Sequence, residues 1–229
     1  MKHRAKDLSL ALEHRLNLYA LAASAAGVGM LALAHPAEAK IVYTPANIPI
    51  AVNAGAVLLD LNHDGINDFQ FYNGYQGPGI PLEGNHASSL LVGPAQQSNR
   101  VWAVDSNKLL CAAAVPKGRT VGPHRPFQPG HSSLDMAFAW GNSVSGGAGC
   151  PWLKVSQDYL GLKFVIKGKV HFGWARVKMG GLENTDYITG YAYETIPNKA
   201  IVTGKTKGTE EQAGSLGALA TGTARRRGW

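Results

Sequence analysis

The chain lacks most of the patterns by which a sequence alone identifies an enzyme or a nucleic-acid-binding protein. It has only two cysteines, and they are not spaced as C-x-x-C, so a structural zinc site has no support. Helical periodicity sustained over several turns is absent after the N-terminal segment, which argues against a helical fold. The net charge is +7, but no basic stripe interleaved with aromatic residues is present, so we expect no nucleic-acid partner.

Catalytic patterns are also missing. In the run 141–147, Ser145 stands where a G-x-S-x-G nucleophile elbow needs its second glycine. His124, His131 and His171 have no H-E-x-x-H spacing. The acidic residues of the body are scattered, and no pair of them suggests a glycosidase. We therefore assign no catalytic residue, although catalytic groups can be assembled in space from distant positions.

The first 39 residues have the pattern of a secretory signal peptide. A basic region that includes Lys2 and Arg4 precedes an apolar segment, residues 16–33, that is rich in Ala and Leu. The small-x-small pattern Ala37-Glu38-Ala39 predicts cleavage after Ala39 and a secreted or cell-surface protein with no stable transmembrane segment. The alternative is an anchor that stays attached, but Ser and Gly residues interrupt the apolar segment, which favours cleavage.

Residues 40–204 are predicted to form one all-β domain, an antiparallel β-sandwich or jelly roll. Short β-prone runs alternate with Gly, Pro, Asn and Ser, as in such folds. The clearest hairpin has Lys167-Gly168 as its turn. We expect its large residues to line one face of a sheet: Leu160, Leu162, Phe164, Ile166, Val170, Phe172 and Trp174. Two segments should be loosely organised, the Pro-rich stretch from Val115 to His131 and a disordered tail, residues 205–229.

Export bears on the two cysteines. An oxidising compartment allows Cys111 and Cys150 to pair, and the intervening segment is rich in Pro and Gly. We predict a disulfide between them. The alternative is two separate thiols that never approach closely enough.

The run from Asp60 to Asp68 has the pattern D-x-N-x-D-G-x-x-D and predicts a calcium site. Calcium prefers six to eight oxygen ligands, and alternate positions of a short loop can supply them. The predicted ligands are the side chains of Asp60, Asn62, Asp64 and Asp68 and the carbonyl of Ile66. Gly65 stands where the chain must turn sharply. The alternative is an Asx-rich turn that binds nothing, because Asp, Asn and Gly are also common turn residues.

This loop is not a full EF-hand. Phe71 occupies the twelfth position, where an EF-hand has a bidentate Glu, and the flanking residues are β-prone. The loop is similar to the Asp/Asn-rich loops of extracellular modules such as dockerin, thrombospondin type 3 and integrin propeller repeats.

Two further resemblances concern the last third of the chain. The tail, residues 215–227, resembles a degraded PEP-CTERM-type sorting signal, although it lacks the Pro-Glu-Pro triplet and its apolar part is too short to span a bilayer. The blocks 159–164, 171–176 and 188–197 resemble a family of uncharacterised exported bacterial proteins. This resemblance implies export and a shared fold, and it carries no known activity.

Three functions remain open. The first is an exported structural or surface-associated protein that calcium stabilises. The second is a carbohydrate- or matrix-binding module, for which Tyr187, Tyr191 and Tyr193 would form a platform on one face of a strand. The third and least favoured is a secreted hydrolase.

Overall fold

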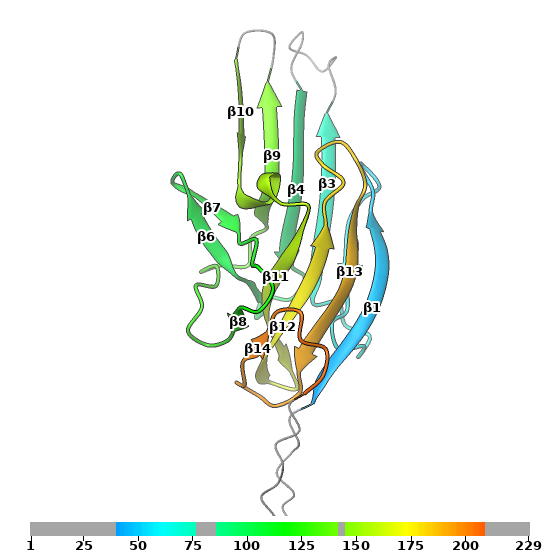
Figure 1. The fold of residues 1–229 in the computed structure, drawn as a ribbon, viewed down its shortest axis with the longest axis vertical. Coiled ribbons are helices and arrows are strands. Elements are labelled where there is room, and N and C mark those ends of the chain that lie inside the picture. Colours follow the sequence, from blue (N-terminus) through cyan, green and yellow to red (C-terminus); the bar gives the residue numbers. More distant parts are fainter. Residues whose placement is uncertain (1–39, 77–85, 142–144, 209–229) are drawn as a thin grey trace, which may run out of the picture. The chain divides into compact units, whose positions relative to one another are not determined.

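The computed structural model describes residues 40–76, 86–141 and 145–208. Their architecture is an antiparallel β-sandwich, as the sequence predicts, in which two sheets face one another (Figure 1). The predicted signal peptide and most of the predicted tail lie outside the described residues.

One sheet has five strands and the other has seven. The five-stranded sheet has the order β1 (Ile41–Ile50), β13 (Asp186–Glu194), β12 (Lys169–Lys178), β11 (Gln157–Ile166) and β5 (Arg100–Val101). The seven-stranded sheet has the order β2 (Val57–Leu59), β3 (Phe69–Gln76), β4 (His86–Pro94), β9 (Leu134–Gly141), β7 (Leu109–Ala112) and β6 (Ala103–Ser106), and β10 (Gly146–Gly149) pairs with β9. A short 3-10 helix, η1 (Pro151–Lys154), leads from β10 towards β11.

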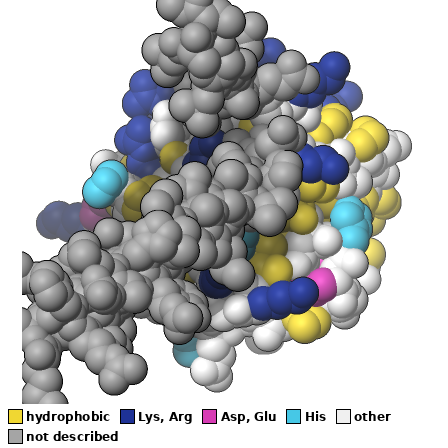
Figure 2. Space-filling view, turned by 90° about the horizontal axis from the view of Figure 1, so that it is seen from below, with side chains coloured by type: hydrophobic (Ala, Val, Ile, Leu, Met, Phe, Trp, Pro, Cys, Tyr) yellow, Lys and Arg dark blue, Asp and Glu magenta, His cyan; other side chains and the backbone are white. Residues whose placement is uncertain are grey.

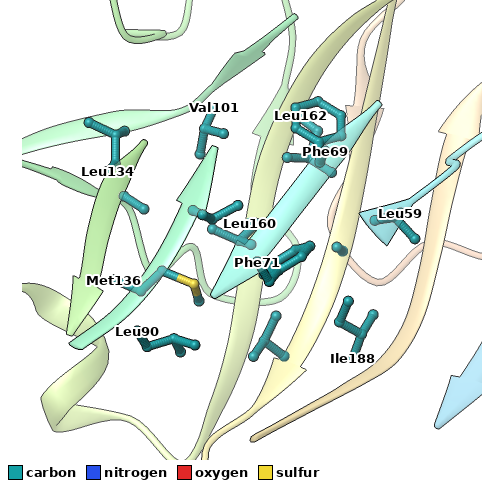
Figure 3. Close-up of a cluster of buried hydrophobic side chains, with 14 of the residues drawn as sticks. Leu59, Phe69, Phe71, Leu90, Val101, Leu134, Met136, Leu160, Leu162 and Ile188 are labelled. Atoms are coloured by element: carbon teal, nitrogen blue, oxygen red, sulfur yellow. The ribbon is translucent and has the colours of Figure 1, made fainter. Parts of the chain in front are cut away.

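The main hydrophobic core lies between these two sheets. Figure 3 shows Phe69 and Phe71 of β3 among side chains from β11, such as Leu160 and Leu162. These four side chains are fully buried, as are Met136 and Ile188 in the same cluster. The alternation of β3 and β11 thus gives each strand one face that packs against the opposite sheet.

The β11–β12 hairpin has the predicted turn, but its large residues do not share one face. Ile166 pairs with Lys169, and Lys167 and Gly168 both have positive φ angles, 49° and 76°, as in a type I′ turn. In this register Leu162 lies opposite Gly173, and Phe172 lies opposite Lys163. Residues that pair directly point to the same side of a sheet, so Leu162 and Phe172 point to opposite sides. The prediction of a single apolar face was wrong. Across this two-residue turn, the even-numbered residues of β11 pair with odd-numbered residues of β12, so the even-numbered large residues of the two strands point to opposite sides.

The outward side of this hairpin is covered by a third, smaller layer. Phe172 and Trp174 belong to a second buried cluster with Val121 and Ile201. The latter two come from a two-stranded sheet of β8 (Thr120–Val121) and β14 (Ile201–Val202). The five-stranded sheet is therefore buried on both faces around β12.

The Pro-rich stretch from Val115 to His131 is better ordered than predicted. It contains β8, and its Val115 and Phe127 form bridges to Tyr159 and Trp102. Val121 is fully buried, and Arg125 lies over the ring of Trp102 at 4.9 Å. These contacts hold the stretch against the five-stranded sheet.

The predicted disulfide is confirmed. Cys111 in β7 and Cys150, just before η1, are bonded, with their Cα atoms 5.7 Å apart and both residues buried. The bond connects β7 to the segment that follows β10.

Candidate calcium loop and its surroundings

The predicted calcium loop connects β2 to β3, as the β-prone flanks indicated. Asp60 organises it: its Oδ1 accepts hydrogen bonds from the backbone N–H groups of His63 and Asp64, at 2.7 and 3.3 Å. Its Oδ2 accepts from the N–H of Gly65 at 2.7 Å. Gly65 has φ of 87°, which is the left-handed conformation that its position in the pattern requires.

Asp64 and Asn62 complete the polar interior of the loop. Asp64 Oδ1 accepts from the N–H of Ile66 at 2.9 Å, and Asp64 Oδ2 accepts from Asn62 Nδ2 at 2.9 Å. Asn62 Oδ1 is buried and, within the described part of the chain, has no hydrogen-bond partner. A buried carbonyl oxygen without a partner is unfavourable.

The loop oxygens keep capacity for a further ligand. An ionised carboxylate offers about four acceptor positions. Asp60 accepts three hydrogen bonds and Asp64 accepts two, so neither carboxylate is saturated. Together with Asn62 Oδ1, these carboxylates form a set of hard oxygen donors on one short loop, and a cation such as calcium prefers such donors.

Asp68 is placed differently from the other predicted ligands. It is buried, its Oδ2 accepts from the N–H of Leu61 at 2.9 Å, and its Oδ1 accepts from Asn99 Nδ2 at 3.1 Å. Burial raises its pKa to about 6, although the bonds from Leu61 and Asn99 oppose the rise, and the charges of Asp60 and Asp64 add to it. In this conformation Asp68 anchors the loop to the body of the domain.

The geometry thus brings three of the five predicted ligand residues together as side chains, Asp60, Asn62 and Asp64. Ile66 follows them, with its side chain 55% exposed and its N–H bound to Asp64. Among the described residues, no three His, Cys, Asp or Glu side chains form a group that could hold a metal ion. The candidate site therefore depends on the amide oxygen of Asn62 as well as on carboxylates.

Tyr191 lies beside this loop and does not belong to an exposed platform. It is 5% exposed and packs in the core between the sheets. Its hydroxyl lies 3.4 Å from His63 Nε2, which is 3.0 Å from Thr44 Oγ1 of β1. Burial raises the pKa of Tyr191, and the negative charge of Asp60 raises it further. His63 and Thr44 had no signal in the sequence pattern, because tertiary packing alone brings β1 next to the loop.

The three tyrosines also do not share one face of β13. Tyr187 pairs with Lys178 and Ile188 with Val177, but the next partners are Gly190 with Arg176 and Tyr191 with Ala175. The register shift leaves Thr189 as an extra residue, and Ile188 and Tyr191 both face the core. Tyr187 consequently points to the opposite side. The expectation of a shared face was wrong because a β-bulge reverses the alternation.

A shallow depression of about 480 Å³ lies between η1 and the segment 179–182. Its lining is mostly apolar, with Lys154 and Ser156 as its polar side chains. The indole N–H of Trp152, which also lines it, is buried without a hydrogen-bond partner among the described residues. This depression is separate from the predicted calcium loop in the sequence and shares no lining residue with it.

The described part of the chain includes no helix with the length and apolar character needed to cross a membrane. No protein-family model matches the chain, and neither does any curated protein or solved structure.

Proposed function

We propose that the chain is an exported structural or surface-associated protein whose β-sandwich is stabilised by one calcium ion in the loop 60–68. The observation that carries the calcium assignment is Asn62 Oδ1, a buried acceptor without a partner on a loop with two unsaturated carboxylates. A cation at this point would give that oxygen a partner and offset the repulsion between Asp60 and Asp64.

Asp60, Asn62 and Asp64 would hold the ion by their side-chain oxygens, with the Ile66 carbonyl and water in addition. Asp68 would join them only by giving up its present bonds to Leu61 and Asn99. So few protein ligands give weak binding, as in extracellular calcium modules, whose Kd is about 0.1–1 mM. The ion then acts on stability, because the loop joins two strands of the seven-stranded sheet.

Export rests on two features that support one another. The N-terminal pattern of residues 1–39 is that of a signal peptide. The buried disulfide between Cys111 and Cys150 fits an oxidising compartment. Mass spectrometry of the protein recovered from the exported fraction should show Lys40 as its first residue, and an exported chain that retained Met1 would contradict cleavage.

Thermal unfolding with calcium and with EGTA tests the calcium site. At about a 100-fold excess over Kd, an ion that binds only the folded state adds about 2.7 kcal/mol, which corresponds to about 5–10 °C in Tm for a domain of this size. We expect this shift in the wild type and its loss in Asp64→Ala. Asp105→Ala is a matched control, because Asp105 accepts a hydrogen bond from the N–H of Lys108 in another turn.

The control should lose some stability but keep the full calcium shift. Equal melting temperatures of the wild type in calcium and in EGTA would refute the site. A shift that survives in Asp64→Ala would place the ion elsewhere.

A further inference from the structure

An exposed row of aromatic side chains crosses the outer face of the seven-stranded sheet, on the side away from the core. Tyr72 is 43% exposed and Trp140 is 51% exposed, while Phe138 lies half-buried near Trp140 on the same strand. Leu58, 51% exposed, extends the row onto β2.

The register shows that these side chains share one face. Phe71 pairs with Val92, and both belong to the core between the sheets. The next pair along β3, Tyr72 with Leu91, therefore points outward. On β4, Ser89 and Ala87 point outward like Leu91. Phe138 pairs with Ser89 and Trp140 pairs with Ala87, so both aromatic side chains of β9 also point outward. Figure 1 shows β3, β4, β9 and β10 as neighbours in this sheet.

Each of the three rings lies next to a glycine. A Cβ atom built on Gly74 would come within 2.6 Å of Tyr72 Cε1, and one on Gly149 within 2.6 Å of Phe138 Cε1. A Cβ on Gly147 would lie 3.1–3.2 Å from three atoms of the Trp140 indole. Each ring therefore occupies part of the space that a side chain at the neighbouring position would fill, and the exposed part of the ring remains open to solvent.

This face carries almost no charge, although the whole chain has a net charge of +7. Among the described side chains of β3, β4, β9 and β10, Asp135 is the only charged one, and burial raises its pKa. The outward polar groups are neutral and suited to hydrogen bonds with hydroxyls: Gln70, Gln76 and Ser89. Lys and Arg side chains gather elsewhere, including around the end of the domain seen in Figure 2.

We infer that this face binds a neutral polysaccharide. A sugar ring has an apolar C–H face that stacks on an aromatic ring and hydroxyls at its edge that bind amide and hydroxyl groups. The absence of Lys and Arg among the described side chains of β3, β4, β9 and β10 matches an uncharged ligand and disfavours an acidic polymer. From Leu58 on β2 to Trp140 on β9 the row covers three strand spacings, about 14 Å, which exceeds the width of one sugar ring and fits a chain.

A second copy of this protein is the competing occupant, and the exposed area disfavours it. An aromatic side chain buries 150–250 Å² at most, Tyr72 and Trp140 are about half exposed and Phe138 is less exposed, so the three rings present on the order of 250 Å². A stable protein interface needs about 800 Å² from each partner.

Pull-down with cellulose and chitin, and affinity electrophoresis in soluble β-glucan, xylan and galactomannan, test the inference. We expect the full chain to bind at least one of these neutral polymers, and Trp140→Ala to weaken that binding about tenfold. Trp140→Phe should restore most of it. Leu153→Ala is the matched control, since Leu153 is an exposed apolar residue, 38% exposed, on η1.

Three outcomes would overturn the inference: no binding to any neutral polymer, equal binding by Trp140→Ala and the wild type, or binding only to an acidic polymer such as alginate. A dimer in analytical ultracentrifugation that Trp140→Ala dissociates would assign the face to a second copy instead. Asp64→Ala should bind polysaccharide like the wild type, so the calcium proposal and this one can fail separately.

Discussion

Removal of the disulfide should lower the stability of the domain by about 4 kcal/mol. Cys111 and Cys150 are separated by 39 positions, and closing a loop of this length in the unfolded chain costs about 13 cal/mol/K of entropy, or about 4 kcal/mol at 25 °C. Domains are commonly stable by only 5–15 kcal/mol, so this is a large share. The β6–β7 hairpin pairs with β9 at one position only, where Cys111 lies opposite Asp135. Because this pairing is so short, the disulfide should contribute a large part of what holds the hairpin in place.

The measurement is urea unfolding of the wild type and of Cys111→Ala/Cys150→Ala, each with and without reductant. The double variant should unfold at a lower midpoint, and reductant should shift only the wild type. Both cysteines are buried, so part of the loss will come from the two missing sulfur atoms. A difference in unfolding free energy below about 1 kcal/mol between the wild type and the double variant would refute the reasoning. The disulfide would then not restrict the unfolded chain to the extent that the loop length predicts.

Two further predictions concern single side chains. Gly173→Ala should destabilise the domain by about 1–3 kcal/mol in the same assay, because its Cβ would lie 2.7 Å from the carbonyl oxygen of Ala192 and 2.8 Å from Leu61 Cδ2. In the control Gly130→Ala, the added Cβ has no atom within 4 Å, so the free energy of unfolding should change by less than about 0.5 kcal/mol. Equal losses of stability in the two variants would contradict the packing argument. Burial raises the pKa of Asp186 from 3.8 to about 6, so the folded state binds a proton more tightly than the unfolded state. Its contribution to stability should therefore be fully present below about pH 4 and lost as the pH rises through 6, by about 2 kcal/mol once solvent screening is allowed for. Asp186→Asn should remove that part of the pH dependence, and an unchanged slope between pH 4 and 7 would count against it.

The candidate calcium loop could be read from the sequence because its pattern is local. The bonds from Asp60 to the N–H groups of His63 and Gly65 span three and five positions, and any chain with this pattern can form them. Asp68 does not lie with the other predicted ligands, because its Oδ1 accepts a hydrogen bond from Asn99, which is 31 positions away in the chain. No spacing rule reaches that far, so the sequence could not show that this carboxylate turns inward.

The aromatic face illustrates the same limit. The sequence pattern suggested a platform on β13, where a bulge at Thr189 turns Tyr191 into the core. The exposed rings are instead those of Tyr72 and Trp140, with the half-buried Phe138 beside Trp140, on two strands more than 60 positions apart. Each of these strands has apolar residues on both sides, so the alternation alone does not tell which side is covered.

The sequence by itself determined the all-β class, the Lys167-Gly168 turn, the disulfide partners and the backbone course of the loop at Asp60. Each of these depends on residues close in the chain or on the only available partner. The tertiary structure alone decided which face of each strand is buried. It placed a third layer over Phe172 and Trp174, turned Tyr191 inward and left Trp140 outside. The physical reason is that a strand with apolar residues on both faces buries whichever side another layer covers, and a single change of register exchanges the two sides.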